Sequence, residues 1–359
     1  MTNNQERVLH VVEAYGGGVQ AAISSYVENS PEFEHLIFAR QRTAHDIGDP
    51  LDNSLTTVSG SLPRFLVEAV RYAKSVRPDI VHLHSSYAGL LRLSAMRAPH
   101  MIYSPHCFAF YRQDMSALSR LLFYIAEQMQ SIRKQTVAAV SPHELYVATS
   151  LIGRPQGHYL PNVSRAKDSS INYLHGNSGA FKPRIISVGR ISAQKGPGFL
   201  AECARRTAGQ YSWTWVGDGT RELRAELEEA DVHVTGWIPN EQVWKEIAEA
   251  DLFVHAALWE GAPITLVDSI RLGTPVIART SRQLDGLGYY QGGKTPAELV
   301  HSVNEFFTNA DIRHRVLSIS SQAAAIRTAE AQHDAIRKLY TFHRRENSAS
   351  EDIHAEPNR

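Results

Sequence analysis

The sequence predicts an α/β protein of two doubly wound, Rossmann-like domains that face a cleft. Short apolar runs alternate with longer amphipathic segments along most of the chain. This alternation occurs twice, in two series separated by a polar stretch at 164–182. The chain has 359 residues, 43% of them hydrophobic, which is enough for two separate cores. Parallel sheets of this kind bind ligands at the carboxyl ends of their strands, so we expect one substrate site between the domains.

The first series forms the N-terminal domain, which we place at 1–165. Its apolar runs are continuous, as expected of parallel strands that are covered on both faces. The expected strands are 8–12, 35–39, 80–83 and 137–140, and helical spacing occurs near 17–28, 63–76, 86–97 and 116–134.

The second series forms the C-terminal domain at 183–328. Its strands are expected at 184–188, 213–216, 232–234, 252–254 and 275–277, and its helices near 195–208, 220–230, 239–249, 263–272 and 296–308. Polar residues with little periodicity predict a linker at 166–182. After a last helix at 329–345, the polar residues 346–359 are expected to be disordered.

The composition excludes several classes of protein. Lys and Arg total 37 and Asp and Glu total 37, so no basic surplus indicates nucleic-acid binding. Two cysteines, Cys107 and Cys203, cannot form a disulfide framework, which favours a reducing compartment. No signal-peptide core follows Met1–Arg7, and no run approaches the roughly 20 apolar residues that span a bilayer. We therefore expect a cytoplasmic protein, attached at most to a membrane face.

Gly16, Gly17 and Gly18 lie between the first expected strand and the first helix. Glycines at such a turn let backbone N–H groups approach a phosphate, and the helix dipole adds positive charge. A tight turn without a ligand is the alternative. The glycines do not complete the dinucleotide fingerprint and no P-loop lysine follows, which disfavours a Rossmann oxidoreductase.

Two cations follow the strand at 184–188. Arg190 comes directly after it and Lys195 opens the next helix. A guanidinium and an ammonium beside a helix N-terminus can clamp a diphosphate and neutralise it as a leaving group. The alternative is a pair of surface cations near a loop.

Two acids follow the strand at 252–254. Glu260 lies in the loop and Asp268 is about two helical turns further on, so both can point along one helix face. Such acids can accept hydrogen bonds from sugar and ribose hydroxyls. The alternative is a glutamate favoured by the helix dipole and a solvated aspartate.

Together these segments resemble family 4 of the retaining glycosyltransferases. The glycine loop, Gly189-Arg190 with Lys195-Gly196, the segment 216–219, and Glu260 followed by Gly-Thr-Pro-Val-Ile occur in the family's order over about residues 7–345. The segment 104–110 with Asp114 is similar to bacterial transferases that build surface polysaccharides. The resemblance implies the GT-B fold, an acceptor-side N-terminal domain, a helix at 329–345 that crosses back to it, and no metal or cofactor.

Carried over by position, the resemblance assigns roles to individual residues. Catalytic roles fall to His106, Glu260, Arg190 and Lys195, and donor binding to Gly17, Gly18, Arg190, Lys195, Glu260, Gly261, Ala262, Pro263, Ile264 and Asp268. Asp268 departs from the family, which has Glu at this ribose-binding position. The segment 282–296 also departs, because a helix follows it almost at once, without the family's intervening strand. No residue is carried over there.

Histidines are abundant, and most of the 17 are expected to be structural. His106 lies just beyond a strand, where the family has a histidine near the donor sugar, so it can hydrogen-bond the sugar. His82 and His84 point to one face of their strand. They are the one closely spaced pair of metal-ligand type, and the cysteines are far apart, so we expect no metal site.

The expected function is retaining transfer of a hexose-type sugar from a nucleotide diphosphate to a saccharide or lipid-linked saccharide. A 2-epimerase of the same fold, or a catalytically silent nucleotide-sugar-binding partner subunit, is the alternative. The segment 116–134 carries an apolar stripe with arginines nearby. It can lie on an anionic bilayer at the inner membrane face, or pack on its own sheet.

Overall fold

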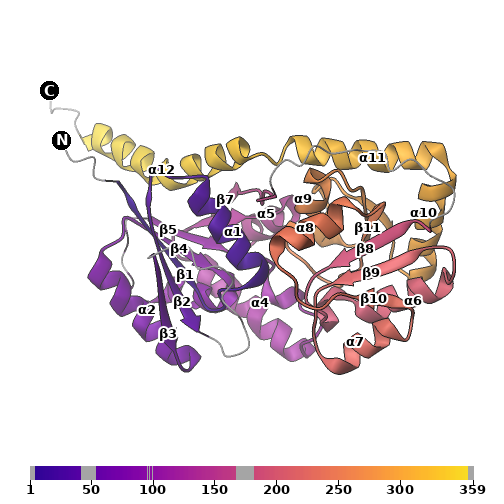
Figure 1. Cartoon of the computed structure of the whole chain (residues 1–359). Coiled ribbons are helices and arrows are strands. Elements are labelled where there is room, and N and C mark those ends of the chain that lie inside the picture. The colour runs from indigo at the N-terminus through magenta and orange to yellow at the C-terminus, as the bar shows by residue number, and fades with distance from the viewer. Residues whose placement is uncertain are drawn as a thin grey trace. The chain divides into compact units, whose positions relative to one another are not determined.

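The computed structural model describes residues 5–41, 54–94, 96, 98, 100–166 and 182–354, the last twelve of these by their backbone alone. The chain forms two compact units, labelled by element in Figure 1. The N-terminal unit comprises Met1–Phe110, Leu118–Pro161 and Ala329–Arg359, and the C-terminal unit comprises Tyr111–Ala117 and Asn162–Thr328. The expected linker at 166–182 lies almost wholly outside the described residues.

The N-terminal unit is built on a parallel sheet of seven strands in the order β3-β2-β1-β4-β5-β6-β7. The strands are β1 (Arg7–Val12), β2 (Glu34–Gln41), β3 (Leu55–Ser59), β4 (Ile80–His84), β5 (His100–Ser104), β6 (Thr136–Ala139) and β7 (Gln156–Tyr159). The helices are α1 (Gly17–Glu28), α2 (Leu62–Val76), α3 (Ser85–Gly89), η1 (Leu90–Leu93), η2 (Ala109–Tyr111), α4 (Ala117–Ser131), α5 (Pro142–Thr149) and α12 (Ala329–His354). The strand order reverses between β1 and β4, as in doubly wound folds.

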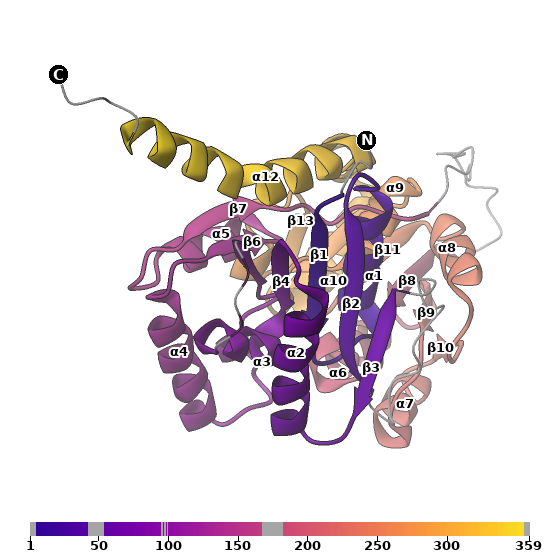
Figure 2. The ribbon, with the colours of Figure 1, turned by 90° about the vertical axis from the view of Figure 1, so that its left-hand side faces the viewer.

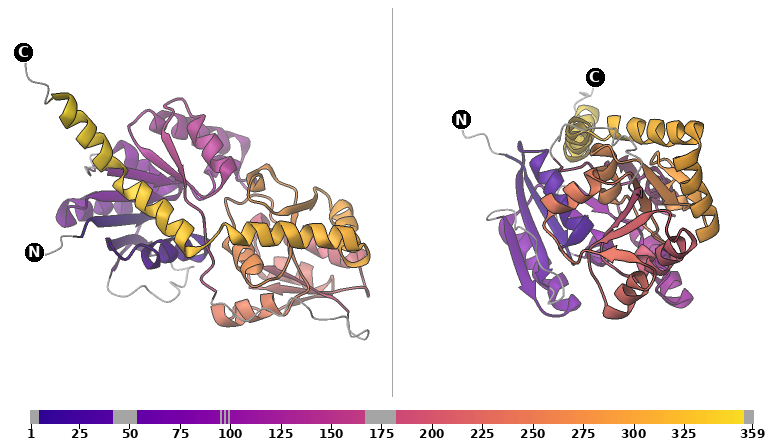
Figure 3. Two further views of the ribbon diagram at one scale, coloured as in Figure 1. Left: turned by 90° about the horizontal axis from the view of Figure 1, so that it is seen from above. Right: turned by 45° about the vertical axis from the view of Figure 1, so that its right-hand side comes forward.

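The C-terminal unit is built on a parallel sheet of six strands in the order β10-β9-β8-β11-β12-β13. The strands are β8 (Arg184–Val188), β9 (Ser212–Val216), β10 (Val232–Val234), β11 (Leu252–His255), β12 (Val276–Arg279) and β13 (Tyr290–Gly293). The helices are η3 (Ala193–Lys195), α6 (Pro197–Arg206), α7 (Arg221–Glu228), α8 (Asn240–Ala248), α9 (Ile264–Arg271), η4 (Arg282–Leu284), α10 (Pro296–Thr308) and α11 (Ala310–Ala325). The right-hand view of Figure 3 shows that the chain turns sharply between α10 and α11.

The fold class predicted from the sequence is confirmed, because both units are doubly wound parallel sheets. Four strands have no counterpart among the predicted ranges: β3, β5, β7 and β13. β5 was expected only as a strand before His106, without bounds. The other three are edge strands of their sheets and have few buried residues, so they carry no continuous apolar run. The presence of β13 also corrects the expectation that no strand lies between 282 and 296.

Both faces of the C-terminal sheet are covered. Neighbouring residues of one strand enter different cores: Ile185 packs with residues of α6 and α10, and Ile186 packs with residues of α8 and α9. Because successive side chains of a strand point to opposite faces, both must be apolar when helices lie on both sides. This explains the continuous apolar runs of the sequence.

Helix α12 belongs to the N-terminal unit, where it runs beside α1 and β7 (Figure 2). Its Gln332 accepts a hydrogen bond from Ser25 Oγ of α1 at 2.6 Å and donates one to the Pro161 carbonyl at 2.7 Å. A disordered tail was expected from residue 346, but in the structure α12 continues to His354. Residues 355–359 lie outside the described residues.

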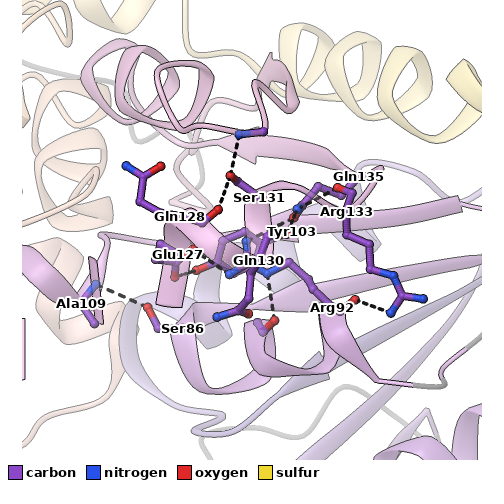
Figure 4. Close-up of polar contacts among 12 residues, drawn as sticks. Ser86, Arg92, Tyr103, Ala109, Glu127, Gln128, Gln130, Ser131, Arg133 and Gln135 are labelled. Atoms are coloured by element: carbon purple, nitrogen blue, oxygen red, sulfur yellow. Dashed lines mark hydrogen bonds and ion pairs between the residues drawn. The ribbon is translucent and has the colours of Figure 1, made fainter. Parts of the chain in front are cut away.

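Helix α4 is held to the N-terminal unit by a buried ion pair (Figure 4). Arg92 Nη2 donates to Glu127 Oε2 at 2.7 Å, and both side chains are almost completely buried. Glu127 Oε1 accepts a further hydrogen bond from the Tyr103 hydroxyl at 2.8 Å, and the guanidinium lies 3.8 Å from the centre of the Tyr103 ring. Gly89 and Gln135 accept the remaining Arg92 hydrogen bonds. The two buried charges are therefore paired with each other and each makes further hydrogen bonds, as buried charges require.

This anchoring turns the apolar stripe of α4 away from the protein. The buried residues of the helix are Glu127, Gln130 and Ser131, which are polar. The apolar side chains are 43% to 68% exposed, and we call them the α4 apolar face: Leu118, Leu121, Leu122, Ile125, Met129 and Ile132. The interpretation that this stripe packs on its own sheet is therefore wrong.

Replacing Arg92 with methionine should lower the free energy of unfolding by about 3–5 kcal/mol, because Glu127 would keep a buried charge without its partner. The measurement is urea denaturation followed by circular dichroism. Arg71→Met is the matched control, since the Arg71–Glu68 pair is largely solvent-exposed and should contribute about 0.5 kcal/mol or less. Equal losses in the two variants would contradict the anchoring role of Arg92.

Candidate functional site

The C-terminal unit brings Lys195 and Glu260 into an ion pair. Lys195 ends η3, between β8 and α6, and Glu260 lies between β11 and α9. Two hydrogen bonds join the loops: Leu258 N–H donates to the Gln194 carbonyl at 2.8 Å, and Gln194 Nε2 donates to the Trp259 carbonyl at 3.0 Å. These hydrogen bonds hold the two loops together, so the Lys195 ammonium and the Glu260 carboxylate lie side by side.

Glycines next to Lys195 allow this close approach. Gly196 has φ +69°, and a Cβ there would lie 2.4 Å from the Ala256 carbonyl oxygen. A Cβ at Gly189 would lie 3.2 Å from Lys195 Cε. A side chain at position 196 would push the Lys195 loop away from Ala256, and one at position 189, where φ is +143°, would be strained and would displace the Lys195 side chain.

His255, the last residue of β11, is a neutral neighbour of Lys195. Burial, and secondarily the Lys195 ammonium, lowers the pKa of His255 at the end of β11 to about 3. His255 is therefore neutral and does not oppose binding of the ammonium to Glu260. His255 is not among the site residues expected from the sequence, although a polar residue ends a buried strand directly before the Glu260 loop.

The segment 282–296 also contributes to the site. Gln283 Oε1 accepts hydrogen bonds from the Glu260 N–H at 3.3 Å and from Ser281 Oγ at 3.1 Å. Gln283 thus positions the backbone of the acid, a role that the sequence analysis did not find because it carried over no residue from this segment.

Arg190 and the residues that lead into α9 are further expected site residues of the C-terminal unit. Arg190 follows Gly189 at the carboxyl end of β8 and is exposed. Gly261, Ala262 and Pro263 connect Glu260 to Ile264, the first residue of α9. The amides at this end of the helix carry partial positive charge, which favours an anion or a hydroxyl oxygen.

Asp268 is engaged within the C-terminal unit. Its Oδ1 accepts a hydrogen bond from Ser164 Oγ at 2.5 Å, and Trp244 also hydrogen-bonds the carboxyl group. Burial raises the pKa of Asp268 to about 6, against the lowering effect of these hydrogen bonds. Nearby, Asn162 Nδ2 donates to the Ala262 carbonyl at 2.7 Å. The two contacts hold the segment 162–164 on α9, and the ribose-binding role of Asp268 stays a prediction.

The other expected site residues belong to the N-terminal unit. Gly17 and Gly18 begin α1, which four residues separate from the end of β1, and both are exposed. Gly17 has φ +55°, and among the described residues no atom outside the adjoining helix backbone lies within 4 Å of the Cβ position at either glycine. The backbone at the start of this twelve-residue helix is therefore open to a ligand.

His106 lies two residues beyond β5 and is partly exposed. His106 and Cys107 both have positive φ, at 51° and 84°, a conformation that costs free energy for residues with a side chain. Glu144 stabilises this turn: its Oε1 accepts the Cys107 N–H at 2.7 Å and its Oε2 accepts the Val140 N–H at 2.8 Å. Glu144 is a positioning residue that the sequence analysis missed, because nothing in its local pattern distinguishes it from an acid in the first turn of a helix.

The pair His82 and His84 has a third histidine beside it. Nitrogens of His10, His82 and His84 all lie within 4.8 Å of one another, and the three side chains are buried. Each ring nitrogen of these residues already has a hydrogen-bond partner, at 2.8 to 3.1 Å. A metal ion would have to replace several of these bonds.

Comparison with known proteins places the chain in a class. Residues 182–309 match the family Glycosyl transferases group 1. A 41.2 kDa uncharacterized protein in the cps region of Klebsiella pneumoniae is 23% identical over 306 residues, which are 77% of this chain and 82% of that protein. The Escherichia coli UDP-Gal:alpha-D-GlcNAc-diphosphoundecaprenol alpha-1,3-galactosyltransferase is 28% identical over 252 residues, which are 59% of this chain and 60% of that enzyme.

Among solved structures, sucrose-phosphate synthase from Thermosynechococcus elongatus aligns with a TM-score of 0.78 and 16% identity. The alignment covers 96% of this chain and all of that one, so the likeness extends over both units. The family match places a group 1 glycosyltransferase domain at residues 182–309, and the solved structure shows that the chain has the GT-B fold. The resemblance drawn from the motifs is confirmed at this level.

Among the helices of the described residues, none is long and apolar enough to cross a membrane.

Glu144→Gln should change how stability depends on pH. Burial raises the pKa of Glu144 from 4.5 to about 7 in the fold. The neutral acid is thus favoured, so its contribution to stability is complete below pH 4.5 and is lost as pH rises through about 7. Relative to Glu144→Gln, the wild type should lose about 3 kcal/mol of unfolding free energy between pH 4.5 and pH 8. Urea denaturation of both proteins across this range measures the difference, and a difference independent of pH would refute the assignment.

Proposed function

We propose that the protein transfers a hexose-type sugar from a nucleotide diphosphate donor to a saccharide or lipid-linked saccharide, with retention of anomeric configuration, in the synthesis of a surface polysaccharide or glycoconjugate. The observation that carries the proposal is the Lys195–Glu260 ion pair at the start of α9, inside the region that matches the glycosyltransferase family. The name of the E. coli relative supports a lipid-linked acceptor.

In this proposal Lys195 and Arg190 bind the donor diphosphate. Their positive charges stabilise the negative charge that develops on the diphosphate as the anomeric C–O bond breaks. These cations supply the stabilisation that a bound metal ion provides in other transferases, so the reaction is proposed to be metal-independent. The amides of Gly17 and Gly18 are proposed as further ligands of the diphosphate.

Glu260 accepts hydrogen bonds from hydroxyl groups of the donor sugar. Its ion pair with Lys195 fixes the carboxylate before the sugar binds, which reduces the entropy lost on binding. The acceptor hydroxyl attacks from the face that the diphosphate leaves, and a diphosphate oxygen takes the acceptor proton. One C–O bond breaks and one forms, with the proton on the departing diphosphate, so the protein contributes positioning and charge stabilisation.

Calorimetric titration in the presence of EDTA, against a panel of UDP-, GDP- and dTDP-sugars, should find one donor that binds. Arg190→Ala/Lys195→Ala should weaken this binding at least about a hundredfold, because both charge-assisted contacts to the diphosphate are lost. Lys245→Ala is the matched control, since Lys245 is an exposed cation of α8.

The outcomes separate the proposal from its alternatives. No binding across the panel by folded protein would contradict the donor site and favour the silent partner subunit. Release of an isomerised sugar from the bound donor, without any acceptor, would replace transfer with the 2-epimerase reaction.

We further propose that the α4 apolar face attaches the protein to an anionic membrane. The six side chains of this face recur at helical spacing and are exposed together, which a soluble surface rarely shows. Ile152, which is 70% exposed, extends the face, because its N–H donates to Gln128 of α4 at 2.7 Å. Arg120, Arg133 and Lys134 are exposed beside it and can attract anionic headgroups.

Leu122→Glu/Ile125→Glu should reduce binding to vesicles of phosphatidylglycerol and phosphatidylcholine at least about tenfold, since two charges would enter the interface. Cosedimentation at several salt concentrations measures the binding, which should weaken as salt rises. Val67→Glu, at an exposed apolar position of α2, is the matched control. Equal binding by the double variant would exclude the face as a membrane site, and a change in oligomeric state instead would identify a second copy as its occupant.

A further inference from the structure

A continuous line of four hydrogen-bonded histidine rings runs through the N-terminal unit to His106. His106 Nε2 lies 2.9 Å from His84 Nδ1, and His84 Nε2 lies 2.9 Å from His10 Nδ1. His10 Nε2 lies 3.0 Å from His35 Nδ1, and His35 Nε2 contacts Ser30. Strand register brings the rings together, since His10 and His35 lie on the sheet face shared by His84.

Ser30 determines the direction of the first hydrogen bond. Its carbonyl oxygen lies 3.1 Å from His35 Nε2 and can only accept a hydrogen bond. Its hydroxyl lies 3.0 Å from the same nitrogen but donates its hydrogen to the Tyr26 carbonyl at 2.6 Å, so it also accepts from His35. Two acceptors at one nitrogen place the hydrogen of His35 on Nε2.

The hydrogen on His35 Nε2 determines which nitrogen carries the hydrogen in each of the other three rings. A neutral histidine has one N–H, so His35 Nδ1 carries a lone pair and accepts the hydrogen of His10 Nε2. By the same step His10 Nδ1 accepts from His84 Nε2, and His84 Nδ1 accepts from His106 Nε2. His106 therefore carries its hydrogen on Nε2 and keeps a lone pair on Nδ1.

The rings are neutral because they are buried. Burial lowers the pKa of His10 and His84 well below the ordinary value, and neighbouring histidines lower it further. Burial also lowers the pKa of His35, and it lowers that of His106 to about 4. A charged ring would have two N–H groups and would interrupt the line, so neutrality is the condition on which the direction of the hydrogen bonds depends.

His82 provides an independent case of the same rule. Its Nε2 lies 2.8 Å from Ser104 Oγ, which donates its own hydrogen to the Ala138 carbonyl at 2.8 Å. His82 must therefore donate from Nε2 and accept the Tyr340 hydroxyl hydrogen at Nδ1, across 3.1 Å. The second chain of bonds also ends on a backbone carbonyl, but it does not include His106.

We propose that the line His35–His10–His84 is a tautomer lock that presents His106 Nδ1 to the ligand as a hydrogen-bond acceptor. This inference rests on the proposed function and on the family resemblance, which places His106 near the donor sugar. Among the described residues nothing engages Nδ1 of His106, and the side chain is partly exposed. A nitrogen lone pair binds a hydroxyl group and repels a carboxylate, so the lock favours neutral hexose donors over uronic acid donors at this position.

The first test is a long-range ¹H–¹⁵N spectrum of the protein labelled at histidine, with His106 assigned by its loss in His106→Gln. All four rings should be neutral with the hydrogen on Nε2. A hydrogen on Nδ1 of any of them would overturn the lock. Zinc bound stoichiometrically at His10, His82 and His84 would also overturn it, because a metal-bound nitrogen carries no hydrogen.

The second test interrupts the line at its centre. His10→Phe should leave His106 as a mixture of tautomers and lower kcat/KM for a neutral hexose donor about tenfold, with nucleotide binding unchanged. The matched control is His82→Phe, which removes a ring equally buried on the same sheet face but leaves the line intact. Equal effects of both variants on the His106 tautomer would overturn the proposal.

The two tests distinguish this inference from the proposed function. The Nε2–H pattern supports the lock whether or not a sugar nucleotide binds. Absence of donor binding across the nucleotide-sugar panel contradicts the proposed function and, with it, the preference for neutral hexoses.

Discussion

Parallel strand pairing is the constraint on which the rest of this structure depends. In a parallel sheet all strands end at the same edge, so loops distant in sequence meet there. In the C-terminal unit the loops after β8, β11 and β12 bring Lys195, Glu260 and Gln283 together. In the N-terminal unit, the segments after β1 and β5 present the start of α1 and His106 at the carboxyl ends of their strands. Backbone pairing therefore decides which side chains meet at the carboxyl ends of the strands.

Two buried polar arrangements refine this framework. Arg92 and Glu127 neutralise each other beneath α4 and so orient the helix with its leucines outward. The histidine line carries no charge, and its hydrogen bonds all point from His106 toward a backbone carbonyl. In both cases a buried polar group is acceptable because its partners are complete, and the completeness of those partners imposes one orientation.

The charges around Lys195 bear on the proposed binding of a donor diphosphate. Lys195 is paired with the negatively charged Glu260. The nearby His255 is neutral, so it does not repel the ammonium. A diphosphate would add negative charge beside a cation already held in place, which is the preorganisation that transition-state stabilisation requires. Gln283 and the joined loops limit how far the pair can move.

The sequence by itself determined the fold class and, apart from the bounds of β5, the central strands of both sheets, because continuous apolar runs are local signals. It also placed Arg190, Lys195 and Glu260 in the segments that follow strands, because glycine-flanked charges are local signals too. It did not reveal the edge strands β3, β7 and β13, which bury too few residues to produce such runs. Only the tertiary structure decided which way α4 faces, since Arg92 is 35 residues from Glu127 in sequence. Likewise, His10, His35, His84 and His106 are scattered along the chain, and only the register of three parallel strands and the turn after a fourth bring their rings within hydrogen-bonding distance.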